Sequence, residues 1–155
     1  MIRAKKSLGQ NFLIDNDVIN KIVDIVDVKN KTLLEVGPGT GKLTAFLLKK
    51  NPKKFYVVEK DDSLAAFLQK EFNNRITIIN DDILKVNESL ISEEKLIVFG
   101  NLPYNISTEI LCKWILNLKD ERIWFSNLIL MFQKEVADRI ISEYNSSKYG
   151  RLSIL

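Results

Sequence analysis

Short apolar runs alternate along this chain with segments in which apolar residues recur every three or four positions. In residues 16–27 that spacing predicts an amphipathic helix, and Asp15 or Asn16 is expected to cap its first turn. The apolar runs predict buried strands. The predicted strands cover residues 32–36, 55–58, 76–79, 96–99 and 124–132, and the further helices cover 41–50, 62–72, 106–118 and 133–144.

This alternation of strands and helices predicts an α/β fold with a mostly parallel sheet, because parallel strands need crossover connections that helices usually supply. Helices are then expected on both faces of the sheet. Ligands of such sheets bind outside the carboxyl ends of the strands, near the point where the strand order reverses. The most unusual residues of this chain follow predicted strands, so the carboxyl edge of the sheet is the expected functional site.

The composition indicates a single domain with an ordinary core, since 46% of the 155 residues are hydrophobic. No apolar run approaches the ~20 residues that span a membrane, and the charged N-terminus lacks the apolar stretch of a secretory signal. Cys112 is expected to be a buried thiol, and the chain is expected to be cytoplasmic. We divide the domain into an N-terminal arm and helix, residues 1–28, and a sheet region, residues 32–155.

A glycine-rich turn with the sequence Gly-Pro-Gly-Thr-Gly, residues 37–41, follows the first predicted strand. It does not fit a nucleotide P-loop, which needs a glycine in place of Val36 and a serine or threonine in place of Leu43. It is also one residue short of the dinucleotide-binding fingerprint. Glu59 follows the next strand, about 20 residues further on, where an acidic side chain can accept both ribose hydroxyls. The turn is therefore either a nucleoside site or a tight turn without a functional role.

A second unusual segment, Asn-Leu-Pro-Tyr at residues 101–104, follows the apolar run of residues 96–99 and one glycine. An amide, a proline and an exposed aromatic residue suit a flat ring with polar edges, such as a nucleobase. Tyr104 can stack on such a ring, which contributes about 1–3 kcal/mol per base, and Asn101 can bind its edge. A structural turn between a strand and a helix is the alternative interpretation.

These two segments belong to a larger pattern, with Ser-Leu-Gly-Gln-Asn-Phe-Leu at 7–13, Val-Glu-Lys-Asp at 58–61 and Tyr-Gly-Arg-Leu-Ser at 149–153. In this order, over essentially the whole chain, they resemble the ribosomal RNA adenine dimethyltransferases. The resemblance implies a Rossmann-like class I methyltransferase fold and the cofactor S-adenosylmethionine. Gly9 and Leu102 resemble the branch that dimethylates two adjacent adenosines of small-subunit RNA more than the antibiotic-resistance branch that acts on large-subunit RNA.

The resemblance also implies which residues bind the cofactor. Gly37 and Gly39 would let the backbone approach the methionine part, and Glu59 would bind the ribose. Asp82 would accept a hydrogen bond from the adenine amine; the less favoured alternative is that Asp81 and Asp82 form a solvated turn. The other expected contacts are Asn11, Leu13, Lys60, Ile83 and Asn101. For the first two of these, a simple lead-in to the first helix is the alternative.

By the same resemblance, the Asn101 side chain and the Leu102 backbone carbonyl would accept both protons of the target adenine amine. These bonds would favour a pyramidal nitrogen, and displacement of a methyl group from a sulfonium depends more on alignment than on acid–base help. Tyr104 would stack on the base, and Pro103 would fix φ in the turn. The 155 residues contain no histidine, the commonest general base, and we expect no metal.

Ribosomal RNA in a precursor of the small ribosomal subunit is the implied partner, and no membrane partner is expected. The net charge of +3 is weak evidence for RNA binding. However, Arg3, Lys5 and Lys6, followed by Gln10, form an N-terminal arm that can neutralise phosphates. The lysine-rich residues 49–54 are expected to be a solvated helix end instead.

The family's catalytic domain continues past the last matching segment into two more strands and a small helical domain. These parts carry a second aromatic residue for the target base and much of the RNA-docking surface, so the resemblance supports cofactor binding more strongly than turnover. We expect the fifth strand to support self-association through its uncovered edge. The alternative functions are a large-subunit RNA methyltransferase, a cofactor- or RNA-binding module without turnover and, least favoured, a nicotinamide-dependent oxidoreductase.

Overall fold

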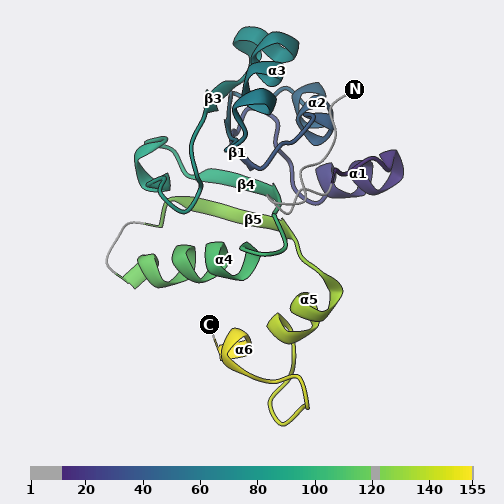
Figure 1. Ribbon diagram of the computed structural model, residues 1–155, viewed down its shortest axis with the longest axis vertical. Helices are drawn as coiled ribbons and strands as arrows, with labels where there is room; N and C mark the ends of the chain where they lie inside the picture. The colour runs from purple at the N-terminus through teal and green to yellow at the C-terminus, as the bar shows by residue number, and fades with distance from the viewer. Residues whose placement is uncertain (1–11, 120–122, 155) are drawn as a thin grey trace.

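The computed structural model describes residues 12–119 and 123–154, which form a parallel five-stranded sheet in the order β3-β2-β1-β4-β5 (Figure 1). The strands are β1 (Thr32–Val36), β2 (Lys54–Val58), β3 (Thr77–Ile79), β4 (Leu96–Asn101) and β5 (Phe125–Met131). The helices are α1 (Asn16–Val23), α2 (Lys42–Lys49), α3 (Asp62–Phe72), α4 (Ser107–Leu116), α5 (Lys134–Ile140) and α6 (Arg151–Ile154), with short 3-10 turns η2 (Asn73–Arg75), η3 (Glu88–Leu90) and η4 (Asn117–Lys119). The predicted parallel α/β fold is confirmed, and the strand order reverses between β1 and β4.

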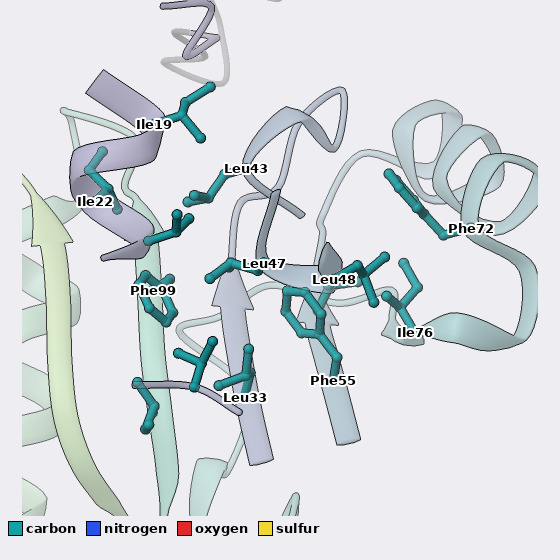
Figure 2. Close-up of a cluster of buried hydrophobic side chains, with 14 of the residues drawn as sticks. Ile19, Ile22, Leu33, Leu43, Leu47, Leu48, Phe55, Phe72, Ile76 and Phe99 are labelled. Carbon is teal, nitrogen blue, oxygen red and sulfur yellow. The ribbon is translucent and has the colours of Figure 1, made fainter. Parts of the chain in front are cut away.

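One face of the sheet is covered by α1, α2 and α3. Figure 2 shows Ile19 of α1, Leu47 of α2 and Phe99 of β4 within this first cluster of buried side chains. Leu33 of β1 and Phe55 of β2 contribute from the sheet. All five side chains are at most 3% exposed, so this face is a continuous core.

The opposite face carries α4 and a second buried cluster. Leu34 belongs to this cluster while its neighbour Leu33 belongs to the first, because successive residues of a strand point to opposite faces. Trp114 of α4 packs edge-on against Trp124, with ring centroids 5.6 Å apart. Helices therefore cover both faces, as the sequence predicts.

The predicted helix boundaries at α1 and α5 are wrong at their carboxyl ends. Asp15 caps α1 by accepting hydrogen bonds from the next turn, as expected, but the helix ends at Val23. Val26 still packs against the first core cluster, so its apolar character comes from a buried loop position. Helix α5 ends at Ile140, and just beyond it the Ser142 hydroxyl donates to the Arg139 carbonyl at 3.0 Å.

Two further details differ from expectation. Helix α6 begins in the Tyr-Gly-Arg-Leu-Ser segment, where no helix was predicted, and packs against α5 (Figure 1). Cys112 is half-buried rather than fully buried, because its position on α4 lies between the core face and solvent. Neither difference changes the arrangement of the sheet.

Candidate cofactor and base site

The register of the parallel strands brings the sequence motifs to one edge of the sheet. Val36 at the end of β1 pairs with Val58 on one side and Gly100 on the other, and Val58 pairs with Ile79. The residues that follow these positions therefore lie side by side: the glycine turn in the middle, Glu59 beside it, and Asn101 on the opposite flank. The expected functional edge is thus formed by the carboxyl ends of β3, β2, β1 and β4.

The glycine turn joins β1 to α2 through a backbone that ordinary residues rarely adopt. Gly39 and Gly41 have φ values of 58° and 75°. A Cβ atom on Gly39 would lie 2.9 Å from the ring of Phe12, and one on Gly41 would lie 2.4 Å from the ring of Phe72. Gly41 is also the N-cap of α2. Both left-handed backbone geometry and close packing therefore require glycine here.

Glu59 holds the glycine turn from the side of β2. One carboxylate oxygen accepts a hydrogen bond of 3.3 Å from the Gly39 N–H, and the other accepts one of 2.9 Å from the Asp61 N–H. Glu59 is buried, and this burial raises the pKa of its carboxyl group above the usual range. Its hydrogen bonds oppose that shift. Glu59 is therefore an acceptor-rich group fixed next to the turn.

Asp82 lies further along the same edge, after β3. Lys60 Nζ donates to one of its carboxylate oxygens at 2.7 Å, and the Leu84 N–H donates to the other at 3.0 Å. The ammonium of Lys60 holds the pKa of Asp82 below its usual range. A carboxylate can accept about four hydrogen bonds, so Asp82 retains acceptor capacity for a ligand amine.

Glu35 is a site residue that the sequence analysis did not assign. It is 2% exposed within β1, and Thr44 Oγ1 donates a hydrogen bond of 2.7 Å to its carboxyl group. Burial raises the pKa of Glu35 to about 8. Its side chain lines a small cavity that Gly37 and Asn101 also line. A lone acidic residue inside an otherwise apolar strand was the available signal for this position.

The segment before α1 also lines the cavity. Its lining residues are Phe12 and Leu13. Lys42 at the start of α2 also lines the cavity, and its Nζ donates a hydrogen bond to the Ile14 carbonyl. This contact, which the sequence analysis did not predict, ties the N-terminal segment to the glycine turn.

The second motif forms a compact turn between β4 and α4. Asn101 is the last residue of β4, and Leu102 is only 1% exposed. The Ile106 N–H donates to the Pro103 carbonyl at 3.1 Å, which closes the turn. Tyr104 remains 40% exposed. The turn therefore buries its leucine and leaves the tyrosine ring available for stacking.

Some predicted residues fall outside the described part of the chain: Arg3, Lys5, Lys6, Gln10 and Asn11. Within residues 12–119 and 123–154, no group of three or more histidine, cysteine, aspartate or glutamate side chains could hold a metal ion. Among the same residues, no helix combines the length and apolar character needed to cross a membrane.

Solved structures of RNA methyltransferases share this architecture. A dimethyladenosine transferase from Plasmodium falciparum superposes with a TM-score of 0.78 and 29% identity, over 93% of this chain and 51% of that one. The 23S rRNA methyltransferase ErmE superposes with a TM-score of 0.70 and 27% identity, over 83% of this chain and 50% of that one. The fold is therefore that of a class I methyltransferase domain. Residues 1–155 match the ribosomal RNA adenine dimethylase family, and the chain belongs to that family.

Curated relatives agree with this assignment. The ribosomal RNA small subunit methyltransferase A of Pelagibacter ubique is 69% identical over 154 residues, which cover 99% of this chain and 58% of the relative. The protein of the same name from Wolbachia pipientis is 45% identical over 159 aligned residues, covering 59% of its length. The family resemblance found in the sequence is thus confirmed, and the chain spans somewhat more than half the length of these relatives.

Proposed function

We propose that this chain binds S-adenosylmethionine at the edge formed by β1, β2 and β4, and that it dimethylates N6 of two adjacent adenosines in small-subunit ribosomal RNA. The observation that carries the proposal is the strand register. It places the glycine turn between Glu59 and Asn101, so a nucleoside cofactor and a target base can meet at one point. The name of the 69% identical relative favours the small subunit as the source of the RNA.

The chemistry of the site suits this cofactor. S-Adenosylmethionine carries positive charge on its ammonium and sulfonium groups, and the carboxyl groups of Glu35 and Glu59 flank the glycine turn. Glu59 would accept the ribose hydroxyls, and Asp82 would accept the adenine amine. Leu13 and Gly37, which both line the cavity, would contact the methionine part. Burial keeps the carboxyl group of Glu35 largely protonated at neutral pH, with a pKa of about 8, so a bound cation would favour its ionised form.

The residues of the second motif would position the target base. When bound, S-adenosylmethionine would supply a methyl group on a sulfonium; the exocyclic nitrogen of adenine would bond to the methyl carbon, the neutral thioether would leave, and one amine proton would be lost. The Asn101 side chain and the Leu102 carbonyl would accept the two amine protons, which makes the nitrogen lone pair available. Tyr104 would stack on the ring, and Pro103 would keep the turn rigid. The chain's main contribution is alignment of the two reacting atoms.

Calorimetric titration of the 155-residue chain with S-adenosylmethionine tests the cofactor part of the proposal. We expect micromolar binding, and we expect Glu59→Ala to abolish it because the ribose loses its acceptor. Glu94→Ala is the matched control: Glu94 is an exposed carboxylate that accepts a hydrogen bond from Thr32 at the opposite end of β1. A folded wild-type chain that binds no cofactor would contradict the proposal.

Transfer of labelled methyl groups to isolated ribosomal RNAs tests the substrate. We expect label in the small-subunit RNA, recovered as dimethyladenosine, and less transfer by Tyr104→Ala at unchanged cofactor affinity. Label in the large-subunit RNA would support the alternative that the structural likeness to ErmE suggests. Cofactor binding without transfer to either RNA would indicate a binding module without turnover.

A precursor of the small ribosomal subunit is the proposed partner, and the cytoplasm is the proposed location. The arm of this chain that would bind the RNA phosphates consists of Arg3, Lys5, Lys6 and Gln10.

We also propose self-association through β5. Within residues 12–119 and 123–154, β5 pairs with β4 alone, which leaves its other edge free for a second copy.

A further inference from the structure

The segment between β3 and η3 carries two of the proposed cofactor residues, Asp82 and Ile83, without forming a helix or a strand. It curls around Asp82, whose backbone carbonyl accepts hydrogen bonds from the Lys85 N–H at 2.8 Å and the Val86 N–H at 3.2 Å. This curl satisfies the N–H groups of Lys85 and Val86. The carbonyl groups of Ile83 and Val86, in contrast, take their donor from another element.

Lys113 of α4 supplies those donors. Its Nζ donates to the Ile83 carbonyl at 2.8 Å, to the Val86 carbonyl at 2.5 Å and to Glu88 Oε1 at 2.8 Å. These bonds account for every N–H donor of the ammonium. The next residue, Trp114, donates from Nε1 to the same Glu88 oxygen at 2.6 Å. Two neighbouring side chains of α4 thus hold both ends of residues 83–88.

The ion pair between Lys113 and Glu88 is more buried than an ordinary surface ion pair. Glu88 is 3% exposed and the Lys113 side chain is 20% exposed, so both charges have lost most of their water. The free-energy cost of removing water from two charges is offset only when the geometry of the ion pair is good and the remaining polar atoms are hydrogen-bonded. Here the ammonium is fully bonded, and what it binds is the backbone of the segment that carries Asp82.

Helix α4 also begins directly after the turn that holds Asn101 and Tyr104. We propose that Lys113 is a positioning residue that fixes the Asp82–Ile83 backbone for the adenine of the cofactor, through the carbonyl groups of Ile83 and Val86. This inference rests on the proposed function. It makes α4 a common support for the two halves of the site, the cofactor's adenine end and the target-base turn.

Calorimetric titrations with two ligands test the inference: S-adenosylmethionine, and 5′-methylthioadenosine, which keeps the adenine and ribose but has no amino-acid part. We expect Lys113→Met to weaken both ligands by the same factor, about tenfold, since the lost support lies at the adenine end that they share. Lys113→Gln retains part of the donor set, so its affinities for both ligands should lie between those of the wild type and those of Lys113→Met. Lys53→Met is the matched control, because Lys53 pairs with Glu94 on an exposed surface.

Each outcome is decisive when the unfolding curves in urea show that the variant is folded at the temperature of the titration. A purely structural role would lower the stability of Lys113→Met but leave both affinities unchanged, and that result would overturn the inference. A loss confined to S-adenosylmethionine would also overturn it. If Lys113→Met does not fold, Lys113→Gln decides, and wild-type affinity in that variant would refute the role. A wild-type chain that binds neither ligand would instead overturn the proposed function, and the inference with it.

Discussion

Thr44 of α2 donates a hydrogen bond of 2.7 Å to the carboxyl group of Glu35 in β1, and both side chains are almost completely buried. The contact connects the strand before the glycine turn to the helix after it. Because burial outweighs this hydrogen bond, the pKa of Glu35 rises to about 8. A carboxylic acid beside the proposed cofactor site therefore titrates in the neutral range.

Glu35 should make the unfolding free energy depend on pH. Its pKa is about 8 in the folded chain and near the ordinary 4.5 in the unfolded chain, so the folded state holds one more proton between these values. Stability from this group is fully present below about pH 4.5 and is lost as the pH rises toward 8, with a slope of up to about 1.4 kcal/mol per pH unit. Urea unfolding from pH 5 to pH 9 should show a flatter dependence for Glu35→Gln, which keeps an acceptor for Thr44. Parallel curves for the two proteins would contradict the assigned shift.

Gly41→Ala should destabilise the fold by about 2–4 kcal/mol. The new Cβ would lie 2.4 Å from Phe72 and 2.8 Å from Leu68, at a φ of 75° that alanine rarely adopts. Gly150→Ala is the control, since a Cβ there has no heavy atom within 4 Å and should change stability by less than about 0.5 kcal/mol. Urea midpoints measure both, and equal midpoints would show that the turn tolerates a side chain.

Lys60→Met should raise the pKa of Asp82 toward its ordinary value. The ammonium of Lys60 is the largest cause of the lowered pKa, through a hydrogen bond of 2.7 Å. Carboxyl-carbon NMR titration of Asp82 measures the change, and Lys53→Met should leave the Asp82 curve unaltered. If Lys60→Met titrates like the wild type, another group must keep Asp82 ionised.

The free edge of β5 should allow the 155-residue chain to self-associate at high concentration. Sedimentation equilibrium would then show a mass above that of one chain. Asn127→Lys should reduce the association, because Asn127 is an exposed residue of β5 and a charge on an edge strand disfavours pairing with another strand. A monodisperse monomer at high concentration would refute this prediction.

Much of the fold was predictable because local patterns specify it. Buried strands are recognisable as apolar runs. The helix predicted at residues 62–72 has the same boundaries in the structure, where Asp61 accepts hydrogen bonds from its first turn. The end of α1 was not predictable, since Val26 has the same apolar character in a loop as it would have in a helix. The role of Glu35 was missed for a related reason: a single acidic residue in a predicted strand does not indicate that the hydroxyl group of Thr44 lies beside it.

The sequence alone determined the alternation of strands and helices, and it located the glycine turn, Glu59 and Asn101 directly after strands. Only the tertiary structure decided which of these lie together. The order β2-β1-β4 sets Glu59 and Asn101 on opposite sides of the glycine turn, although the residues between β2 and β4 include another strand. Lys113 likewise meets Glu88 only after α4 packs on the sheet. Strand order and buried polar pairs depend on cores built from distant segments, and local sequence patterns do not encode those contacts.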